Sequence, residues 1–316
     1  MLAHDLAGRL AAGDVRALAR AIRMVEDRDP EIARVLREVR SRTGRAHIVG
    51  VTGPPGSGKS TLCDQVIERW RSQGHRVGVI AVDPSSPFSG GAILGDRIRM
   101  QRHTTDSGVF IRSMAARGHV GGLAAAAREA VRLLDAGGRD RCLVETVGVG
   151  QSELEVMRTA DTTVVVTTPA AGDAVQIIKA GILEIADIFV VNKADLPGAA
   201  KVYRDLKDLV RQTKGHAAWQ PPVIQTSAQT GNGVDELVEA LDRHHDAIAT
   251  GGELERRRRE RLRAEVEAIV VERSADRARR ALHERTMEDE LAGDLRDVDP
   301  YALAERILNP NGQTGR

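Results

Sequence analysis

Short runs of β-branched and other apolar residues alternate with amphipathic stretches between residue 46 and about residue 250. Each run is long enough for one strand, and each amphipathic stretch has the spacing of a helix that buries one face. This alternation is typical of an α/β domain in which helices cover both faces of a mainly parallel sheet. The predicted strands are HIVGVT, RVGVIAV, GVFIRSM, RCLVET, TTVVVTT, IFVVN and PPVIQT.

The two ends of the chain have a different pattern. Residues 1–45 predict a helical arm that Asp29-Pro30 interrupts. Residues 251–316 are strongly charged and predict long helices with a narrow apolar stripe, which needs a partner to bury it. The expected organisation is therefore an arm (1–45), an α/β domain (46–250) and a C-terminal helical region (251–316). The expected apolar faces are Val15, Leu18, Ala19, Ile22 and Val25 in the arm, and Leu254, Leu262, Val266, Ile269 and Val270 in the tail.

Composition narrows the class of protein. The chain has 316 residues, 41% of them apolar, which is enough for a sizeable core. Lys plus Arg (46) nearly cancel Asp plus Glu (45), which argues against nucleic acid or an anionic membrane as the main partner. No apolar run reaches the ~18 residues that span a bilayer, and two cysteines suit the reducing cytoplasm. Three features are expected to be structural: Cys63 and Cys142 as buried apolar residues, the arginine run 256–259 as a solvated helix face, and His244-His245 as a surface pair.

The segment GPPGSGKST matches the phosphate-binding P-loop pattern. A predicted strand enters it, and a helix leaves it that Gly74 is placed to end. The glycines let backbone N–H groups curl around phosphate oxygens, and the helix N-terminus adds its positive dipole. Lys59 is expected to reach the β- and γ-phosphates, and Ser60 to complete the shell of a Mg²⁺ ion. The predicted phosphate-binding residues are Gly53, Pro54, Pro55, Gly56, Ser57, Gly58, Lys59, Ser60 and Thr61.

A second set of polar residues follows the predicted strand IFVVN. Asn192, Lys193 and Asp195 form the N-K-x-D arrangement of guanine-binding proteins. The Asp195 carboxylate can accept hydrogen bonds from guanine N1–H and the 2-amino group, which adenine does not offer. Lys193 can lie along the ring, and Asn192 can tie this loop to the P-loop. In TSAQTGNGV, at the next strand end, Ser227-Ala228 matches the loop whose backbone N–H meets guanine O6, so GTP is the predicted nucleotide.

Three acids and a glycine are candidates for the metal and hydrolysis site. Glu145 ends a predicted strand, and ligands of a parallel sheet collect at such ends, so we expect Glu145 to reach Mg²⁺ directly or through water. Gly148 is expected to offer its N–H to the γ-phosphate, as the ETVG turn does in related enzymes. Asp83 is assigned to positioning magnesium or water, and Asp96 to a switch that senses the γ-phosphate and Mg²⁺. Capping of a helix end is the alternative role for each acid. Because no glutamine directly follows Gly148, hydrolysis by the isolated protein is expected to be slow.

These motifs, in this order and spacing, resemble the MeaB/ArgK family of P-loop GTPases, which includes methylmalonic aciduria type A proteins and has the α/β fold of the SIMIBI class of P-loop NTPases. The most specific segments are DPSSPFSGG and RSMAARGHVGG, which ordinary GTPases lack. The resemblance covers residues 46 to about 245 closely. It implies a GTP-hydrolysing chaperone of an adenosylcobalamin-dependent acyl-CoA mutase, chiefly methylmalonyl-CoA mutase, which gates cofactor loading and protects or reactivates the mutase.

The same resemblance implies a homodimer joined through C-terminal helices. It also implies a further switch at residues 168–181 that communicates with the mutase. An ordinary amphipathic helix cap is the alternative for that segment. Its polar candidates are Asp173, Gln176 and Lys179.

Two other functions remain open. A metallochaperone-type GTPase would share this architecture but usually carries a His-rich tract or a cysteine motif, whereas this chain has nine scattered histidines and two distant cysteines. A protein kinase of transport-system components is the role implied by the old name ArgK, although nothing in the sequence resembles a separate acceptor-binding domain.

Overall fold

The predicted strands are all present and form one seven-stranded parallel sheet with the order β3-β2-β4-β1-β5-β6-β7. The computed structural model describes residues 3–83, 101–103, 105–115, 120–146, 148, 151–169, 182–215, 217–283 and 298–308. The strands are β1 (His47–Thr52), β2 (Val77–Asp83), β3 (Val109–Ala115), β4 (Arg141–Thr146), β5 (Thr162–Thr167), β6 (Ile188–Asn192) and β7 (Val223–Thr226).

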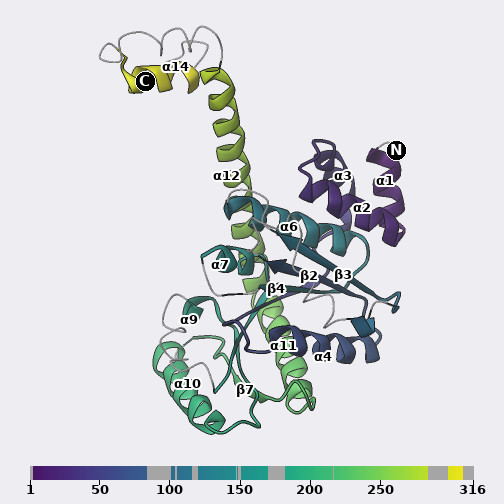
Figure 1. Ribbon diagram of the computed structural model, residues 1–316, viewed down its shortest axis with the longest axis vertical. Helices are drawn as coiled ribbons and strands as arrows, with labels where there is room; N and C mark the ends of the chain where they lie inside the picture. The colour runs from purple at the N-terminus through teal and green to yellow at the C-terminus, as the bar shows by residue number, and fades with distance from the viewer. Residues whose placement is uncertain are drawn as a thin grey trace. The chain divides into compact units, whose positions relative to one another are not determined.

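Helices cover both faces of this sheet (Figure 1). Along β5, Val164 and Val166 pack with α4 and α11, whereas Val165 packs with α10 on the other face, as the two-residue period of a strand requires. Burial on both faces explains why the strands are continuous apolar runs. The helices are α1 (Ala3–Ala11), α2 (Val15–Glu26), α3 (Ile32–Val39), α4 (Lys59–Ser72), α6 (Val120–Ala136), α7 (Gln151–Met157), α9 (Ile182–Ile185), α10 (Ala199–Lys214), α11 (Val234–Thr250), α12 (Glu253–Leu282) and α14 (Pro300–Leu308), with 3₁₀ turns η1 (Arg40–Arg42) and η2 (Gln101–His103).

The helical arm, α1 to α3, belongs to the core of the sheet domain. Its apolar residues form one buried cluster with α6, β2 and β4, and Figure 1 shows the arm beside α6. The buried stripe of α2 differs from the prediction, because Val15 is 44% exposed. Val15 is the first residue of α2, directly after the Asp14 cap, and the buried residues of the helix begin only at Ala17. The residues of α2 that are buried are Ala17, Leu18, Ala21, Ile22 and Val25.

A single carboxylate fixes the passage from the arm into β1. Asp135, near the end of α6, accepts hydrogen bonds from the backbone N–H groups of Gly44, Arg45 and Ala46. The contact gives these three backbone donors an acceptor and holds the linker against α6.

A buried polar network lies at the N-terminal end of β1 and β5. His47 Nε2 is 2.8 Å from Thr162 Oγ1, and Thr162 Oγ1 is 2.8 Å from His244 Nδ1. His244 Nε2 lies 3.2 Å from Asp187 Oδ1, and Arg257 donates to both oxygens of Asp187. Asp187 is an acceptor, so it faces the His244 ring and the Arg257 guanidinium from the side where both present nitrogen atoms. Burial lowers the pKa of His47 well below its ordinary value, which keeps that ring neutral.

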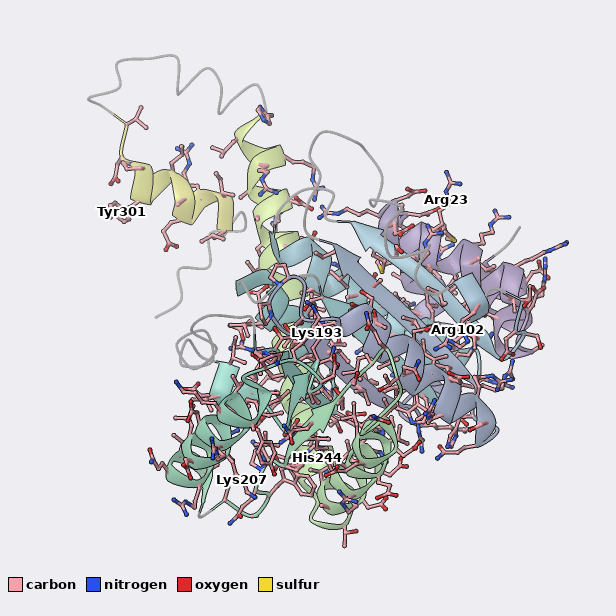
Figure 2. All side chains as sticks on the ribbon, turned by 60° about the horizontal axis from the view of Figure 1, so that its bottom comes forward. Arg23, Arg102, Lys193, Lys207, His244 and Tyr301 are labelled. Carbon is pink, nitrogen blue, oxygen red and sulfur yellow. The ribbon has the colours of Figure 1, made fainter. Side chains whose placement is uncertain are left out.

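Two surface assignments are therefore wrong. His244, labelled in Figure 2, is completely buried. It lies on the buried face of α11 with Leu241 and Ile248, and its ring contacts Thr162. Arg257, expected on a solvated face, binds Asp187 and fastens the first turn of α12. The cysteines agree with the prediction: Cys63 and Cys142 are both buried, and burial raises the pKa of the Cys142 thiol.

The chain divides into two compact units, residues 1–257 and 258–316. The predicted stripe of the tail is split between them. Leu254, in the first unit, is 8% exposed. Four stripe residues in the second unit are between 40% and 57% exposed: Leu262, Val266, Ile269 and Val270. None of the described helices is long and apolar enough to cross a membrane.

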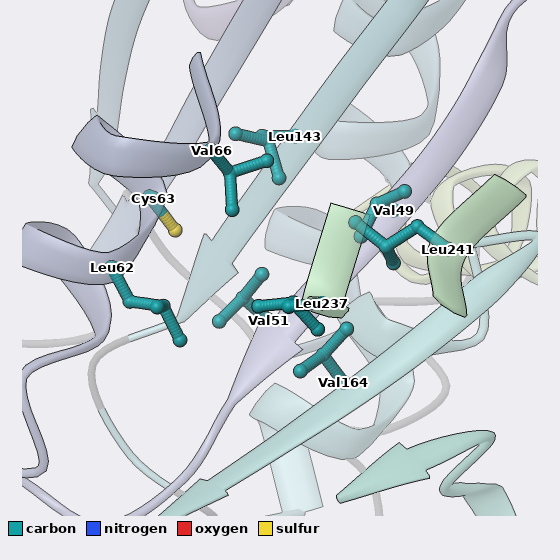
Figure 3. A pocket seen from close by; sticks show the side chains of 9 residues that line it. All are labelled: Val49, Val51, Leu62, Cys63, Val66, Leu143, Val164, Leu237 and Leu241. Carbon is teal, nitrogen blue, oxygen red and sulfur yellow. The ribbon is translucent and has the colours of Figure 1, made fainter. Parts of the chain in front are cut away.

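A small cavity of about 10 Å³ lies between the sheet and the helices α4 and α11 (Figure 3). Its lining is entirely apolar, so a water molecule there would find no hydrogen-bond partner. The cavity is a packing gap behind the P-loop helix. Its lining residues are Val49, Val51, Leu62, Cys63, Val66, Leu143, Val164, Leu237 and Leu241.

Candidate functional site

The P-loop, residues 53–58, connects β1 to α4 at the carboxyl edge of the sheet. A Cβ atom on Gly53 would lie 2.1 Å from the carbonyl oxygen of Val166, and one on Gly58 would lie 2.4 Å from Asn192 Nδ2. Gly58 also has a φ of +86°, in the left-handed region that favours glycine. Because α4 begins directly after the loop, its first backbone N–H groups are available to an anion. The loop therefore has the shape and the dipole of a phosphate cradle.

The Lys59 ammonium lies against the loop that precedes it. Its Nζ donates to the carbonyl oxygens of Gly53 (2.8 Å) and Pro54 (3.0 Å), and the residue is only 5% exposed. These contacts hold a compact positive charge beside the start of α4, where it adds to the helix dipole. Pro55 and Gly56, at the outside of the loop, are exposed.

Ser60 and Glu145 meet at the start of α4. Ser60 Oγ donates to Glu145 Oε1 at 2.6 Å, and both residues are buried. The parallel register pairs Val51 with Glu145, so this acid lies beside the strand that leads into the P-loop. A hydroxyl and a carboxylate are the hard oxygen ligands that Mg²⁺ prefers, and the hydroxyl can donate to the carboxylate while its lone pairs face a cation. The two residues fit the expected magnesium site; Thr61, the next residue, is half-buried.

The buried amide of Asn192 joins three segments of the site. Its Nδ2 donates to the Ser57 carbonyl oxygen at 2.8 Å. Its Oδ1 accepts from Thr226 Oγ1 and from the backbone N–H of Ala228, both at 3.1 Å. Asn192 is 1% exposed, so these hydrogen bonds are shielded from water. The P-loop and the loops after β6 and β7 are therefore held as one unit.

The residues expected to bind guanine lie next to this amide. Lys193, labelled in Figure 2, is half-buried and has a φ of +58°, which is uncommon for a residue other than glycine. Such strained backbone positions cluster at binding sites. A hydrogen bond from Ser227 and the charge of Lys193 lower the pKa of Asp195, so its exposed carboxylate is an ionised acceptor. The structure thus brings together the two loops predicted to share one base.

The remaining candidates are described only in part. Asp83 is the last residue of β2 and pairs with Ala115 of β3, and its side chain lies outside the described residues. The carbonyl oxygen of Gly148 accepts a hydrogen bond from Thr52. Four candidates lie wholly outside the described residues: Asp96, Asp173, Gln176 and Lys179.

A carboxylate on the P-loop helix was not anticipated from the sequence. Asp64, four residues after Ser60, contacts Arg102 at 2.5 Å and His103 at 2.9 Å. Although burial opposes ionisation, the hydrogen bonds from His103 and Arg102 hold the pKa of Asp64 below its ordinary value. Both partners are in η2, directly after residues 84–100, and Figure 2 labels Arg102. The sequence feature that could have identified Asp64 is an acidic residue on the otherwise apolar side of the P-loop helix.

In the part of the chain that the structure describes, no group of three or more His, Cys, Asp or Glu side chains is arranged to hold a metal ion.

Comparison with known proteins agrees with this geometry. The family described as "Methylmalonyl Co-A mutase-associated GTPase MeaB" matches residues 18–283. A putative GTPase of Pyrococcus horikoshii is 50% identical over 308 residues, covering 96% of both chains. A "Methylmalonic aciduria type A homolog, mitochondrial" of Mus musculus is 38% identical over 270 residues, covering 79% of this chain and 64% of the other. A crystal structure of a "LAO/AO transport system kinase" has a TM-score of 0.69 and 29% identity, and covers 97% of this chain and 96% of that one. The chain therefore belongs to the MeaB family of P-loop GTPases.

Proposed function

We propose that this GTPase is a chaperone of an adenosylcobalamin-dependent acyl-CoA mutase, with methylmalonyl-CoA mutase as the expected client. The match over residues 18–283 to a family described as mutase-associated is the observation that carries this choice. The mouse relative named for methylmalonic aciduria supports it. In this role GTP acts as a timer that gates cofactor loading and protects or reactivates the mutase.

The residues around the P-loop have separate proposed tasks in GTP hydrolysis. Lys59 neutralises charge on the β- and γ-phosphates, and Ser60 and Glu145 hold the Mg²⁺ ion. When bound, Mg²⁺ supplies further neutralisation of the phosphate charge. Asp83 and Asp96 remain the proposed residues for positioning water and for sensing the γ-phosphate. Basal turnover is slow, because these groups supply charge while the mutase is needed to complete the water-positioning geometry.

Two further proposals concern the state of the protein. The exposed stripe Leu262, Val266, Ile269 and Val270 is proposed to pair with a second copy, because apolar residues repeated along a charged helix are typical of a helix–helix seam. The two buried thiols, Cys63 and Cys142, suit a reducing compartment, and we place the protein in the cytoplasm.

The test is co-purification with candidate mutases, scored by GTP hydrolysis. The wild-type protein is mixed with methylmalonyl-CoA, isobutyryl-CoA or ethylmalonyl-CoA mutase in GTP and in GDP. One mutase should be retained in a nucleotide-dependent manner and should accelerate hydrolysis. Lys59→Ala is the matched control, since it should lose tight GTP binding and with it the nucleotide dependence. Hydrolysis that no mutase accelerates, together with no retention in either nucleotide, would refute the chaperone role.

A further inference from the structure

Two buried threonines stand side by side at the carboxyl ends of β1 and β4. The register pairs Val51 with Glu145, so Thr52 and Thr146 are neighbours at the next position. Both threonines are completely buried, and their Oγ1 atoms are 3.1 Å apart. A buried hydroxyl is costly unless it makes a hydrogen bond, so this pair needs defined partners.

The shared partner is the carbonyl oxygen of Gly148. It lies 2.9 Å from Thr52 Oγ1 and 3.3 Å from Thr146 Oγ1. Each hydroxyl has one proton to donate. Thr52 gives its proton to the Gly148 carbonyl over the shorter distance, and Thr146 gives its own to Thr52 Oγ1. The result is a directed chain from Thr146 through Thr52 to Gly148.

These hydrogen bonds connect the P-loop to the segment after β4. Thr52 immediately precedes Gly53, the first residue of the P-loop, and Gly148 lies in the turn that follows Glu145. The contact between Ser60 and Glu145 joins the same two segments on the metal side. A glycine has wide conformational freedom, so an anchored carbonyl is needed to restrict the orientation of Gly148.

We propose that Thr52, with Thr146 behind it, is a positioning residue for GTP hydrolysis. The two hydroxyls hold Gly148 in the orientation that presents its backbone N–H to the γ-phosphate. This inference rests on the proposed contact between Gly148 and that phosphate group. GDP lacks the γ-phosphate, so loss of these hydrogen bonds should affect the GTP complex and the hydrolysis rate more than the affinity for GDP.

The test uses isolated full-length protein, with no mutase present. Thr52→Val removes the hydroxyl and keeps the branched shape, whereas Thr52→Ser keeps the hydroxyl. We expect Thr52→Val to lower the single-turnover rate about tenfold, the effect expected when a buried carbonyl loses its main donor. The Kd for GDP should change less than about threefold, and Thr52→Ser should recover most of the rate. Thr146→Val should act in the same direction but more weakly, because Thr52 can still donate. Thr163→Val, at the opposite end of neighbouring β5, controls for the loss of a buried strand threonine.

Two results would overturn the inference. The first is a hydrolysis rate in Thr52→Val equal to that of Thr163→Val. The second is an equal loss of GTP and GDP affinity, which would mean that the threonine only supports the fold of the P-loop. If Thr52→Val does not fold, the same two quantities, the single-turnover hydrolysis rate and the Kd for GDP, are measured for Thr146→Val. A rate equal to that of Thr163→Val would then overturn the inference. Failure of the mutase role leaves these measurements unaffected, since no mutase takes part in them.

Discussion

Replacing Asn192 by aspartate changes one end of a side chain that joins three loops. An oxygen would still accept from Thr226 Oγ1 and the Ala228 N–H, as Oδ1 does now at 3.1 Å. The other end would exchange an N–H donor for an oxygen, 2.8 Å from the carbonyl oxygen of Ser57. The variant therefore cuts the link to the P-loop and leaves the link between the two guanine loops.

The structure sets the size of the expected effect. Loss of one buried hydrogen bond together with two opposed oxygens costs about 2–3 kcal/mol. Nucleotide binding then has to hold the released P-loop in place, so Kd should rise by up to roughly 30- to 150-fold. The loss should apply equally to GTP and GDP, because both place phosphates on the P-loop. The preference for GTP over ATP should stay within about threefold of the wild-type ratio, since the contacts among the guanine loops survive. Asn192→Ala removes all three hydrogen bonds and should lose both affinity and preference.

Fluorescence titration with GTP, GDP and ATP measures both quantities in one experiment. Thermal unfolding without nucleotide is the control, because it separates a damaged fold from a damaged site. The reasoning is wrong if Asn192→Asp binds GDP as tightly as the wild type. It is equally wrong if this variant loses its preference for guanine while keeping its affinity.

Three other predictions concern the loop, the buried network and the core. Gly58→Ala should weaken GTP binding by about 2–3 kcal/mol more than Gly56→Ala in the same titration. Both glycines have left-handed φ values, but only at Gly58 would the new Cβ meet Asn192, at 2.4 Å. Asp187→Asn should cost about 3 kcal/mol of unfolding free energy at neutral pH, seen in urea melts, because it leaves the half-buried guanidinium of Arg257 and the buried ring of His244 without their acceptor. Burial opposes ionisation of Asp187, but contacts from His244 and Arg257 hold the pKa of this carboxylate below its ordinary value. Its contribution to stability is therefore present above about pH 4 and is lost as pH falls through the pKa of the folded state. An acid titration in which variant and wild type lose stability in parallel would contradict this. Val164→Ile should fill the apolar cavity and raise stability by up to about 0.8 kcal/mol, whereas a lower Tm would show that the gap is too narrow for a methyl group.

The fold was readable because its signals are local. Each strand is a short apolar run bounded by turn residues, and burial on both faces makes such runs continuous. The P-loop has the same advantage, since its glycines, Lys59 and Ser60 are consecutive. Asn192 and Ser227 follow strand ends, which a parallel sheet brings to a single edge.

Other parts could not be predicted because their partners are distant in the sequence. His244 lies at helical spacing from the buried Leu241 and Ile248, which marks it as facing the core, but its hydrogen-bond partner Thr162 is 82 residues earlier. The Thr52 hydroxyl donates its hydrogen bond to Gly148, 96 residues later, which the sequence around Thr52 does not indicate. Val15 has the angular position of a buried residue but lies at a helix end, where burial depends on how far the neighbouring element extends.

The arm also limits how the protein can be shortened. Leu10 and Ile22 of the arm are 0% exposed and belong to the same cluster as Leu133 and Leu134 of α6. A truncated version starting at β1 would expose the remaining residues of that cluster as a continuous apolar surface, and such surfaces promote aggregation during expression. Limited proteolysis in the linker should instead yield two fragments that stay together until denaturant is added.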